Sequence, residues 1–468
     1  MAEWRMAMNV EGKRALVVGL GKSGIASAQF LATRGARVTV SDTRSQSELK
    51  NQIPALLERG IAIETGGHGE RTFQNQDLIV VSPGVPSNVP QLVQARAQGI
   101  PVIGEIELAA RFLKGKIVAI TGSNGKTTTT TLCGDLIASA SKRTLVGGNI
   151  GTPVILLVDD STDDTFDVIE VSSFQLETIE TFHPYVAVVL NITPDHLDRH
   201  GTLEAYTAAK ARIFDNQTTA DYSVLNLDDP GSAALRSKTR GQLCWFTRKQ
   251  ALSGNQMGAF VRENEIFWRD GKTDEQVMPV SEIPLKGAHN LENVLAAVSV
   301  GRLCGCDAKS IRNAVRKFKA VEHRLQYIAT IGGVEYYNDS KATNVDATIK
   351  AIESFPGNIH LILGGKDKDS DYTQMNDLLR QRVKRVYTIG AAADKIRSHV
   401  QSAVEVLPCG TLANALERAY DLARSGEIVL LAPACSSFDQ FENYEHRGRT
   451  FRALVEQMAG PAAAQERR

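Results

Sequence analysis

Short apolar runs alternate with segments of helical spacing along the amino-terminal part of the chain. Each run is bounded by polar or glycine positions, and the segments between the runs repeat apolar residues every three or four positions. This alternation predicts a parallel sheet whose strands are joined by crossover helices. The expected strands are 15–18, 38–41 and 78–81, and the expected helices are 25–34, 49–59 and 89–98.

The alternation of strand and helix patterns starts again twice further along the chain. Because 468 residues exceed what one hydrophobic core supports, we expect three α/β domains with limits 1–106, 107–320 and 321–468. The second series has expected strands 116–120, 168–171, 186–190, 224–227, 244–247 and 259–268, and expected helices 128–138, 289–303 and 308–318. The third series has expected strands 335–338, 360–363, 386–389 and 428–431, and expected helices 345–353 and 413–424.

Composition limits the class of partner. The 53 basic and 53 acidic residues balance, so the chain has no net positive charge that would attract nucleic acid or an anionic membrane. No apolar run is long enough to insert into a membrane, and the amino terminus lacks the pattern of a signal peptide. The six cysteines include no Cys-x-x-Cys pair, which favours free thiols in a reducing compartment. We expect a monomeric cytoplasmic protein whose partners are small molecules.

A glycine-rich turn at 121–127 is the strongest chemical signal. It follows an apolar run and opens a helical segment, and its sequence Thr-Gly-Ser-Asn-Gly-Lys-Thr has the frame G-x-x-G-K-T, with Ile120 where the longer form of the motif has a glycine. Backbone N–H groups at such a turn bind phosphate, the lysine adds a positive charge and the following hydroxyl can bind Mg²⁺. An ordinary glycine turn is the alternative. The expected triphosphate-binding residues are Gly122, Ser123, Asn124, Gly125, Lys126, Thr127 and Thr128.

A second glycine motif follows the first expected strand. Residues 19–24 form a complete G-x-G-x-x-G, and Asp42 ends the next strand at a distance suited to a ribose hydroxyl. A nicotinamide dinucleotide is one ligand for this pattern. A UDP-sugar is another, because the turn recognises a diphosphate and not what lies beyond it. The expected residues here are Gly19, Leu20, Gly21, Lys22, Ser23, Gly24 and Asp42, with a further turn at Ser82, Pro83 and Gly84.

Polar residues gather at the ends of the central strands. Glu170 ends an apolar run, and 191–200 places two histidines and two aspartates directly after another. Strand ends are where open α/β sheets bind ligands, and a carboxylate there can bind Mg²⁺. Lys210 lies in an amphipathic helical segment, where the pattern alone favours a solvated lysine. Asn290 and Asn293 lie one helical turn apart, so their amides can contact a purine or cap the helix.

Four of these motifs together resemble the Mur ligases, ATP-dependent enzymes that form amide bonds in peptidoglycan precursors. The motifs are TGSNGKTT (121–128), NITPDHLDRH (191–200), GAHNLENVLAA (287–297) and EHR (322–324), and the resemblance spans nearly the whole chain. It implies three domains: a Rossmann-like domain that binds a UDP substrate, a central P-loop ATPase-like domain and a Rossmann-like carboxyl-terminal domain. The motifs NDSKATN (338–344) and PACSSFDQF (433–441) resemble the family members that add D-glutamate to UDP-N-acetylmuramoyl-L-alanine.

The resemblance also implies roles for individual residues. Thr127, Glu170, His196 and Lys210 correspond to the ligands of two Mg²⁺ ions, with Lys210 as a carbamate formed from CO₂, and Lys126 is included in the catalytic set. Two positions depart from the family's D-glutamate pocket. Lys366 is a second lysine that competes with Lys368 for the pocket role, and Tyr444 stands where a phenylalanine is expected. The other implied residues are Asn290, Asn293, Arg324, Asp339 and Lys341 for ATP; Thr43, Arg44, Asn149, Ser172 and Gln175 for the UDP substrate; and Thr343, Lys368, Ser437 and Tyr444 for D-glutamate.

The implied reaction activates a substrate carboxylate as an acyl phosphate, which the amine of D-glutamate then attacks. Two other classes remain open from the motifs alone. A P-loop protein that hydrolyses ATP to drive a mechanical change would release phosphate without an acceptor. A nicotinamide oxidoreductase would change the absorbance of NAD(P)H.

Overall fold

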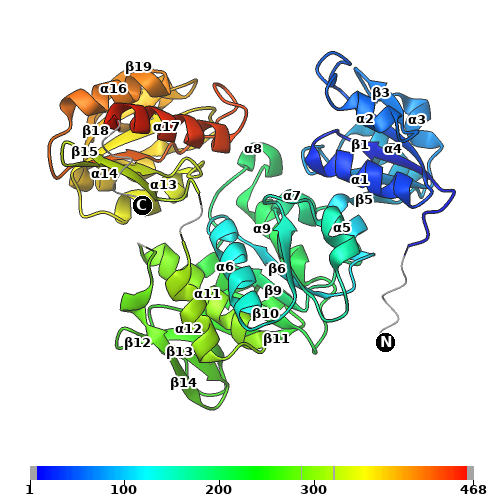
Figure 1. The fold of residues 1–468 in the computed structure, drawn as a ribbon, viewed down its shortest axis with the longest axis horizontal. Helices are drawn as coiled ribbons and strands as arrows, with labels where there is room; N and C mark the ends of the chain where they lie inside the picture. The colour runs from blue at the N-terminus through cyan, green and yellow to red at the C-terminus, as the bar shows by residue number, and fades with distance from the viewer. Residues whose placement is uncertain (1–7, 286, 320–321, 461–468) are drawn as a thin grey trace. The chain divides into compact units, whose positions relative to one another are not determined.

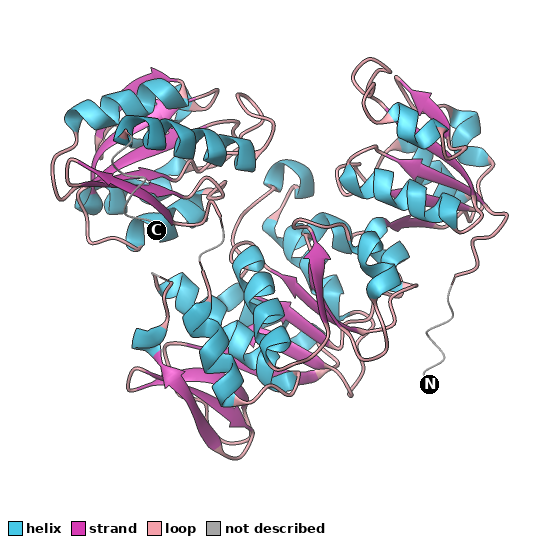
Figure 2. Ribbon diagram, in the orientation of Figure 1, coloured by secondary structure: helices cyan, strands magenta, loops and turns pink. Residues whose placement is uncertain are grey.

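The computed structural model describes residues 8–285, 287–319 and 322–460. Its strands form three sheets, each flanked by helices (Figures 1 and 2). Its contacts divide these residues into two compact units, one with residues up to 192, 207–282 and 293–316, the other with 193–206, 283–292 and the rest from 317 onward. The expected α/β class is confirmed. The three domain limits expected from sequence remain a prediction. No helix in the described ranges is long and apolar enough to cross a membrane.

The first sheet is parallel, with strand order β3-β2-β1-β4-β5. Its strands β1 and β4 are apolar and buried over 15–18 and 78–81, as expected for strands of a parallel sheet covered by helices on both faces. The helix expected at 49–59 is shorter in the structure, where α2 spans Ile53–Leu57. Pro54 lies in its first turn, where a helix tolerates proline best. The elements are β1 (Arg14–Val18), α1 (Lys22–Thr33), β2 (Arg37–Asp42), α2 (Ile53–Leu57), β3 (Ala62–Thr65), α3 (Glu70–Gln74), β4 (Leu78–Val81), α4 (Pro90–Ala97) and β5 (Val102–Gly104).

The second sheet has nine strands in the order β14-β13-β12-β11-β10-β9-β6-β8-β7. The expected strand at 259–268 is instead a hairpin, in which Glu263 and Asn264 both have positive φ, as a two-residue type I′ turn requires. The strands are β6 (Lys116–Thr121), β7 (Thr144–Gly148), β8 (Phe166–Glu170), β9 (Val186–Val189), β10 (Tyr222–Asn226), β11 (Gln242–Thr247), β12 (Met257–Arg262), β13 (Glu265–Asp270) and β14 (Asp274–Pro279).

Most helices of the central region connect these strands, while α5 precedes them and α11 and α12 follow them in the chain. The α-helices are α5 (Glu105–Ala110), α6 (Lys126–Ser139), α7 (Ser173–Leu176), α8 (Leu197–His200), α9 (Leu203–Ala211), α10 (Pro230–Ala234), α11 (Ala288–Leu303) and α12 (Ala308–Lys317). The 3₁₀ helices are η1 (Val154–Asp160), η2 (Arg212–Phe214), η3 (Leu235–Lys238) and η4 (Val280–Glu282). All six cysteines are free, as expected, and five of them are buried.

The third sheet has the order β15-β16-β20-β17-β18-β19, and only β15 runs antiparallel. Two apolar clusters fill its two faces. The elements are β15 (Gln326–Ile331), β16 (Val334–Asn338), α13 (Val345–Glu353), β17 (Ile359–Gly364), η5 (Tyr372–Met375), α14 (Asn376–Arg382), β18 (Val383–Ile389), α15 (Ala393–Val400), β19 (Glu405–Gly410), α16 (Leu412–Leu422), β20 (Ile428–Leu431) and α17 (Tyr444–Ala459).

A polar network lies inside this sheet. His360 is fully buried, with Nε2 at 2.8 Å from Glu427 Oε2 and Nδ1 at 2.7 Å from the Tyr387 hydroxyl, and Lys384 pairs with the other carboxylate oxygen. Burial raises the pKa of Glu427, but hydrogen bonds from Lys384 and its other partners outweigh burial and bring the pKa to about 2. A carboxylate only accepts hydrogen bonds, so His360 donates through Nε2 and accepts from Tyr387 at Nδ1.

Glu427→Gln should therefore lower the stability of the carboxyl-terminal sheet at neutral pH. Because the pKa of Glu427 lies below that of an unfolded glutamate, its contribution is present above about pH 4.3 and is lost as the pH falls toward 2. Hydrogen exchange of β17 and β20 should rise in the variant at pH 7, and the difference from the parent should shrink toward pH 3. Glu405→Gln, which removes an exposed pair with Arg385, is the control and should change exchange little. Equal effects of both changes would contradict the assignment.

Candidate functional site

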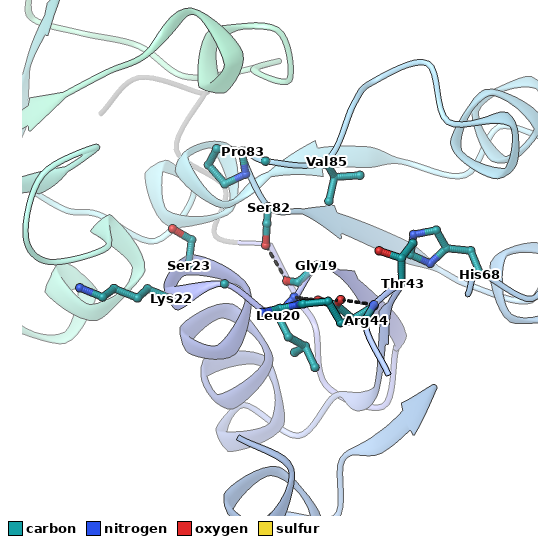
Figure 3. Close-up of a pocket in the computed structure, with 13 residues that line it drawn as sticks. Gly19, Leu20, Lys22, Ser23, Thr43, Arg44, His68, Ser82, Pro83 and Val85 are labelled. Atoms are coloured by element: carbon teal, nitrogen blue, oxygen red, sulfur yellow. Dashed lines mark hydrogen bonds and ion pairs between the residues drawn. The ribbon is translucent and has the colours of Figure 1, made fainter. Parts of the chain in front are cut away.

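The first glycine motif forms one wall of a pocket of about 430 Å³ (Figure 3). The motif curves between β1 and α1, and the loop after β4 faces it, with Ser82 Oγ donating to Gly19 O at 2.7 Å. Gly24 does not line the pocket but packs beneath it, since a Cβ there would lie 1.9 Å from Gly19 O. The lining residues are Gly19, Leu20, Gly21, Lys22, Ser23, Asp42, Thr43, Arg44, His68, Ser82, Pro83, Gly84 and Val85.

Asp42 shapes this pocket through four hydrogen bonds. Its carboxylate accepts from the Leu20 N–H at 2.7 Å, from the Arg44 N–H at 2.9 Å and twice from the Arg44 guanidinium. Burial raises the pKa of Asp42, but these bonds outweigh burial and bring the pKa to about 2. Asp42 thus holds the glycine turn and Arg44 in place, in addition to the ligand contact expected from sequence.

The second glycine turn joins β6 to α6, as its pattern predicts. Gly122 has φ 152° and Gly125 has φ 85°, and the Lys126 ammonium donates to the carbonyls of Gly122 and Ser123, both at 2.9 Å. The Thr127 hydroxyl donates to Glu170 Oε2 at 2.8 Å, and both side chains are buried. A threonine hydroxyl beside a carboxylate is a donor set that suits Mg²⁺, which prefers oxygen ligands.

Two further expected residues lie against this turn and its carboxylate. Asn149 donates from Nδ2 to Glu170 Oε1 at 2.8 Å and from its backbone N–H to Glu170 O at 2.9 Å. Asn293 Oδ1 accepts from Thr129, and a Cβ on Gly125 would lie 2.2 Å from that oxygen. The glycine is therefore required both by its positive φ and by the close approach of Asn293.

Ser172 and Gln175 also lie near Glu170 in sequence, but they bond to each other. Ser172 is the N-cap of α7, its hydroxyl accepts from the Gln175 N–H, and Gln175 Oε1 accepts from the Ser172 N–H at 3.0 Å. This reciprocal capping box fixes the turn directly after β8.

Lys210 is buried, so the solvated lysine favoured by its amphipathic pattern is wrong. Only 1% of the residue is exposed, and Nζ donates to Gly122 O at 2.9 Å and lies 3.4 Å from Thr121 Oγ1. Helix α9 brings the ammonium to the start of the second glycine turn because its apolar face packs inward. The chain thus places two lysines, Lys126 and Lys210, on the same carbonyl oxygen.

The segment that carries His196 belongs to the second compact unit. Asp195 Oδ1 lies 3.2 Å from Lys368 Nζ, and Asp195 Oδ2 accepts from Asn344 Nδ2 at 3.1 Å. His196 has a positive φ of 55°, and its N–H donates to Asp195 Oδ1 at 3.0 Å. A lysine and an amide from two loops of the carboxyl-terminal sheet thus converge on one carboxylate.

Two loops of the carboxyl-terminal sheet contact each other near the residues expected to bind D-glutamate. Lys366 and Ser436 form an isolated antiparallel bridge, with Lys366 N–H donating to Ser436 O at 2.9 Å. The neighbouring Ser437 is buried. Lys341 Nζ lies 5.1 Å from the centre of the Tyr444 ring, a distance at which an ammonium is attracted to the ring face. Thr343 lies on the same loop as Lys341.

Asp339 directly follows β16 and is buried next to the expected nucleotide residue Arg324. Burial raises the pKa of Asp339 to about 6, and Arg324, the Leu325 N–H and Lys341 oppose the rise. The Leu325 N–H donates to Asp339 Oδ1 at 3.3 Å. Arg324 Nε is buried and has no hydrogen-bond partner within the described residues, so a ligand oxygen could satisfy it.

Three family models match the chain in succession. The Mur ligase MurD-like amino-terminal domain matches residues 13–104, the Mur ligase middle domain matches 120–301, and the Mur ligase glutamate ligase domain matches 323–435. A UDP-N-acetylmuramoylalanine--D-glutamate ligase from Koribacter versatilis is 61% identical over 97% of this chain and 99% of its own length. The chain belongs to the Mur ligase family.

Other proteins similar to this Mur ligase belong to the same family or share its fold. A ligase of the same name from Acidobacterium capsulatum is 60% identical, over 98% of this chain and 99% of its own. Among solved structures, a pseudomurein peptide ligase type C from Methanothermus fervidus is 20% identical with a TM-score of 0.59, over 95% of this chain and 100% of its own. A MurC ligase from Thermotoga maritima is 19% identical with a TM-score of 0.57, over the same shares. The solved structures support the fold.

Two residues of this Mur ligase were not expected from sequence. His68 lines the first pocket, and its Nδ1 lies 2.7 Å from Ser41 Oγ; the only signal was its glycine-rich surroundings, Gly66-Gly67-His68-Gly69. Arg447 is fully buried, and its guanidinium donates to Ser340 Oγ at 3.0 Å, to Ser340 O at 2.8 Å and to the carbonyls of Cys435 and Ser436. An arginine in an amphipathic helix offers no signal of such burial.

Asp42→Ala should weaken the binding of uridine diphosphate by about tenfold, because loss of charged hydrogen bonds of this kind costs about 1.5–3 kcal/mol and frees the glycine turn. Titration calorimetry with UDP measures the change. Asp77→Ala is a matched control, since Asp77 also bonds an arginine, Arg14, but lies outside the pocket. Unchanged UDP binding by the Asp42 variant, or equal loss in both variants, would contradict this role.

Proposed function

We propose that this chain is an ATP-dependent ligase that joins D-glutamate to UDP-N-acetylmuramoyl-L-alanine. The observation that carries the proposal is the high identity, over nearly the full length of both chains, to relatives named for that reaction. Two glycine turns on separate sheets fit a reaction with two nucleotides, one for the UDP group and one for ATP.

Phosphate release tests this function. The protein should release phosphate when UDP-N-acetylmuramoyl-L-alanine, D-glutamate and ATP are all present, and far less when D-glutamate is omitted or replaced by L-glutamate or meso-diaminopimelate. Equal release without any acceptor would support a P-loop ATPase instead. A change in NADH absorbance would support an oxidoreductase.

The ATP end of the reaction is assigned to the turn between β6 and α6. Mur ligases use ATP and Mg²⁺, and here Thr127, Glu170, His196 and Lys210 are proposed to hold two such ions, which when bound neutralise the triphosphate. Lys126 adds a fixed positive charge at the same turn. Its ammonium already bridges two backbone carbonyls, so it needs only a small movement to meet a phosphate oxygen.

The proposed reaction has two steps, phosphoryl transfer and then attack by the amine. The carboxylate of the alanyl substrate attacks the γ-phosphorus of ATP, the bond to the β-phosphate oxygen breaks, and an acyl phosphate and ADP form. The amine of D-glutamate then attacks the acyl carbon, an N–H proton is lost to a base, and inorganic phosphate leaves. Asp195 and His196 are the proposed polar groups at the amine, since their segment bonds directly to loops of the carboxyl-terminal unit.

The acceptor carboxylate is assigned to Lys368 together with Thr343, Ser437 and Tyr444. Lys368 Nζ already pairs with a carboxylate, that of Asp195, and only 13% of its side chain is exposed. Lys366 is exposed, and its backbone forms the bridge to Ser436. This contrast favours Lys368 over Lys366 as the residue that binds substrate.

Lys368→Ala should accordingly raise the KM for D-glutamate by about tenfold or more, because one charged hydrogen bond is worth about 1.5–3 kcal/mol. Lys366→Ala is the matched control and should change the same KM less than about twofold. Steady-state kinetics with varied D-glutamate measures both. The reverse order of effects would assign the carboxylate to Lys366.

We further propose that Lys210 works as a carbamate. Its Nζ is buried at the triphosphate turn, where reaction of the neutral amine with CO₂ would replace a cation by an oxygen ligand suited to Mg²⁺. Lys210→Arg keeps the charge but cannot form a stable carbamate. It should lower kcat by at least about 100-fold, the scale seen when a group that stabilises developing charge is removed.

Two measurements check this role of Lys210. Wild-type activity should fall in CO₂-depleted acidic buffer and return with bicarbonate, and a short carboxylic acid should partly restore Lys210→Ala. Lys309→Arg, on the exposed side of α12, is the control and should stay fully active. A fully active Lys210→Arg enzyme would show that the carbamate is not needed.

A further inference from the structure

Helix α5 carries two buried carboxyl groups, Glu105 and Glu107, with different surroundings. Glu107 accepts from the backbone N–H groups of Glu180, Thr181 and Phe182, from the Thr181 hydroxyl and from Arg111. Its hydrogen-bonding capacity is filled, and it fastens α5 to the segment that follows α7. No part of the reaction described above uses either glutamate.

Glu105 is bonded on one side only. Its Oε1 accepts from the Ile155 N–H at 2.8 Å, and the Val154 N–H also bonds the carboxyl. Its Oε2 is buried without a hydrogen-bond partner within the described residues. Val154 and Ile155 are the first residues of η1, whose N-cap Pro153 offers no side-chain cap. Glu105 therefore satisfies N–H groups at the start of η1 that would otherwise be buried and unpaired.

The loop directly before η1 carries Asn149. That residue is fixed to Glu170 through its side chain and its backbone, and Gly148 N–H donates to Thr152 O at 2.9 Å across the loop. The loop 148–153 is therefore held between two carboxylates, Glu170 at its beginning and Glu105 at its end. Glu105 also follows β5 directly, so one residue connects the last strand of the UDP-binding sheet to this loop.

We propose that Glu105 is a positioning residue for the sugar and peptide end of the UDP-linked substrate, acting through the loop 148–153. The proposal rests on the proposed function and on the expected role of Asn149 in binding the UDP substrate, where we take it to contact the muramoyl part. Glu105 itself touches no substrate. The UDP group is held elsewhere, by the pocket around Asp42, so loss of Glu105 should weaken recognition of the muramoyl end and spare recognition of UDP.

The ionisation of Glu105 offers an independent readout. Burial raises the pKa of Glu105 to about 7, and the two η1 N–H groups oppose the rise. The carboxyl is therefore about one-tenth ionised at pH 6 and about nine-tenths at pH 8. An ionised carboxylate accepts more strongly than a neutral acid, so the hold on η1 should tighten as the pH rises.

Charged groups on the neighbouring elements are engaged elsewhere or exposed. The strands β4 and β5 carry none. Arg111 pairs with Glu107 and Glu180, Arg34 at the end of α1 pairs with Asp159 of η1, and the remaining charges on these elements, Lys22 and Asp160, are exposed. The pH effect is thus attributed to Glu105 itself.

Binding of two ligands to three variants tests the proposal. Titration calorimetry without ATP compares UDP with UDP-N-acetylmuramoyl-L-alanine. Glu105→Ala should raise the Kd of the full substrate about tenfold and leave that of UDP within about twofold. Glu105→Gln keeps an acceptor for the η1 N–H groups and should restore the full-substrate Kd to within about threefold. The ratio of wild-type to Glu105→Gln affinity for the full substrate should rise from pH 6 to pH 8, a comparison that cancels titration of the ligand.

Glu107→Gln is the matched control, because it weakens a buried carboxylate on the same helix without touching η1. It should lower the thermal midpoint of unfolding and leave the ratio of the two Kd values unchanged. Equal weakening of both ligands by Glu105→Ala, no weakening of either, or the same pattern in Glu107→Gln would overturn the positioning role alone. Wild-type protein that binds the full substrate no better than UDP would overturn the proposed function as well.

Discussion

The buried carboxylate of Glu170 is the contact on which the central site depends. It accepts from Thr127 in the triphosphate turn and from Asn149 in the loop before η1, and less than 2% of it is exposed. A buried carboxylate without such partners would be strongly destabilising, so the two donors are as necessary to the fold as the carboxylate is to them. Because strand β8 pairs with β6 on one side and β7 on the other, its last residue lies between the two loops that follow those strands. A single side chain thus aligns the groups proposed to meet the phosphate and the sugar.

The sequence predicted the parts of the fold that depend on local pattern. The strands 78–81 and 428–431 and the helix 345–353 match the structure, because apolar runs and caps are visible in the residues themselves. Elements with weak local signals were missed. Strand β3 is only half-buried, and β19 contains a proline. The residues at 259–268 predict one strand and not the hairpin of β12 and β13, because the turn uses Glu263 and Asn264 in place of a glycine.

The candidate site also contains residues that the sequence predicts and residues that only the fold reveals. Glycine turns could be found from sequence because each requires positive φ or a close approach, as at Gly125. Lys210 could not be judged from its helix, since its burial depends on segments about ninety residues earlier. Glu105 and Glu107 are ordinary helical glutamates by pattern, and only the fold shows that one is filled with hydrogen bonds while the other is half-paired.

Arg447 has a consequence for the order of folding during synthesis. It lies in α17, and its four acceptors are in Ser340, Cys435 and Ser436, the first of them 107 residues earlier. The loops around the amino-acid residues therefore cannot reach their final positions until the last helix has left the ribosome. The two nucleotide turns, built from residues before 294, can form while the rest of the chain is still being made. A shortened chain that lacks α17 would keep both glycine turns but would lose the side chain that fixes the loops at Ser340 and Ser436.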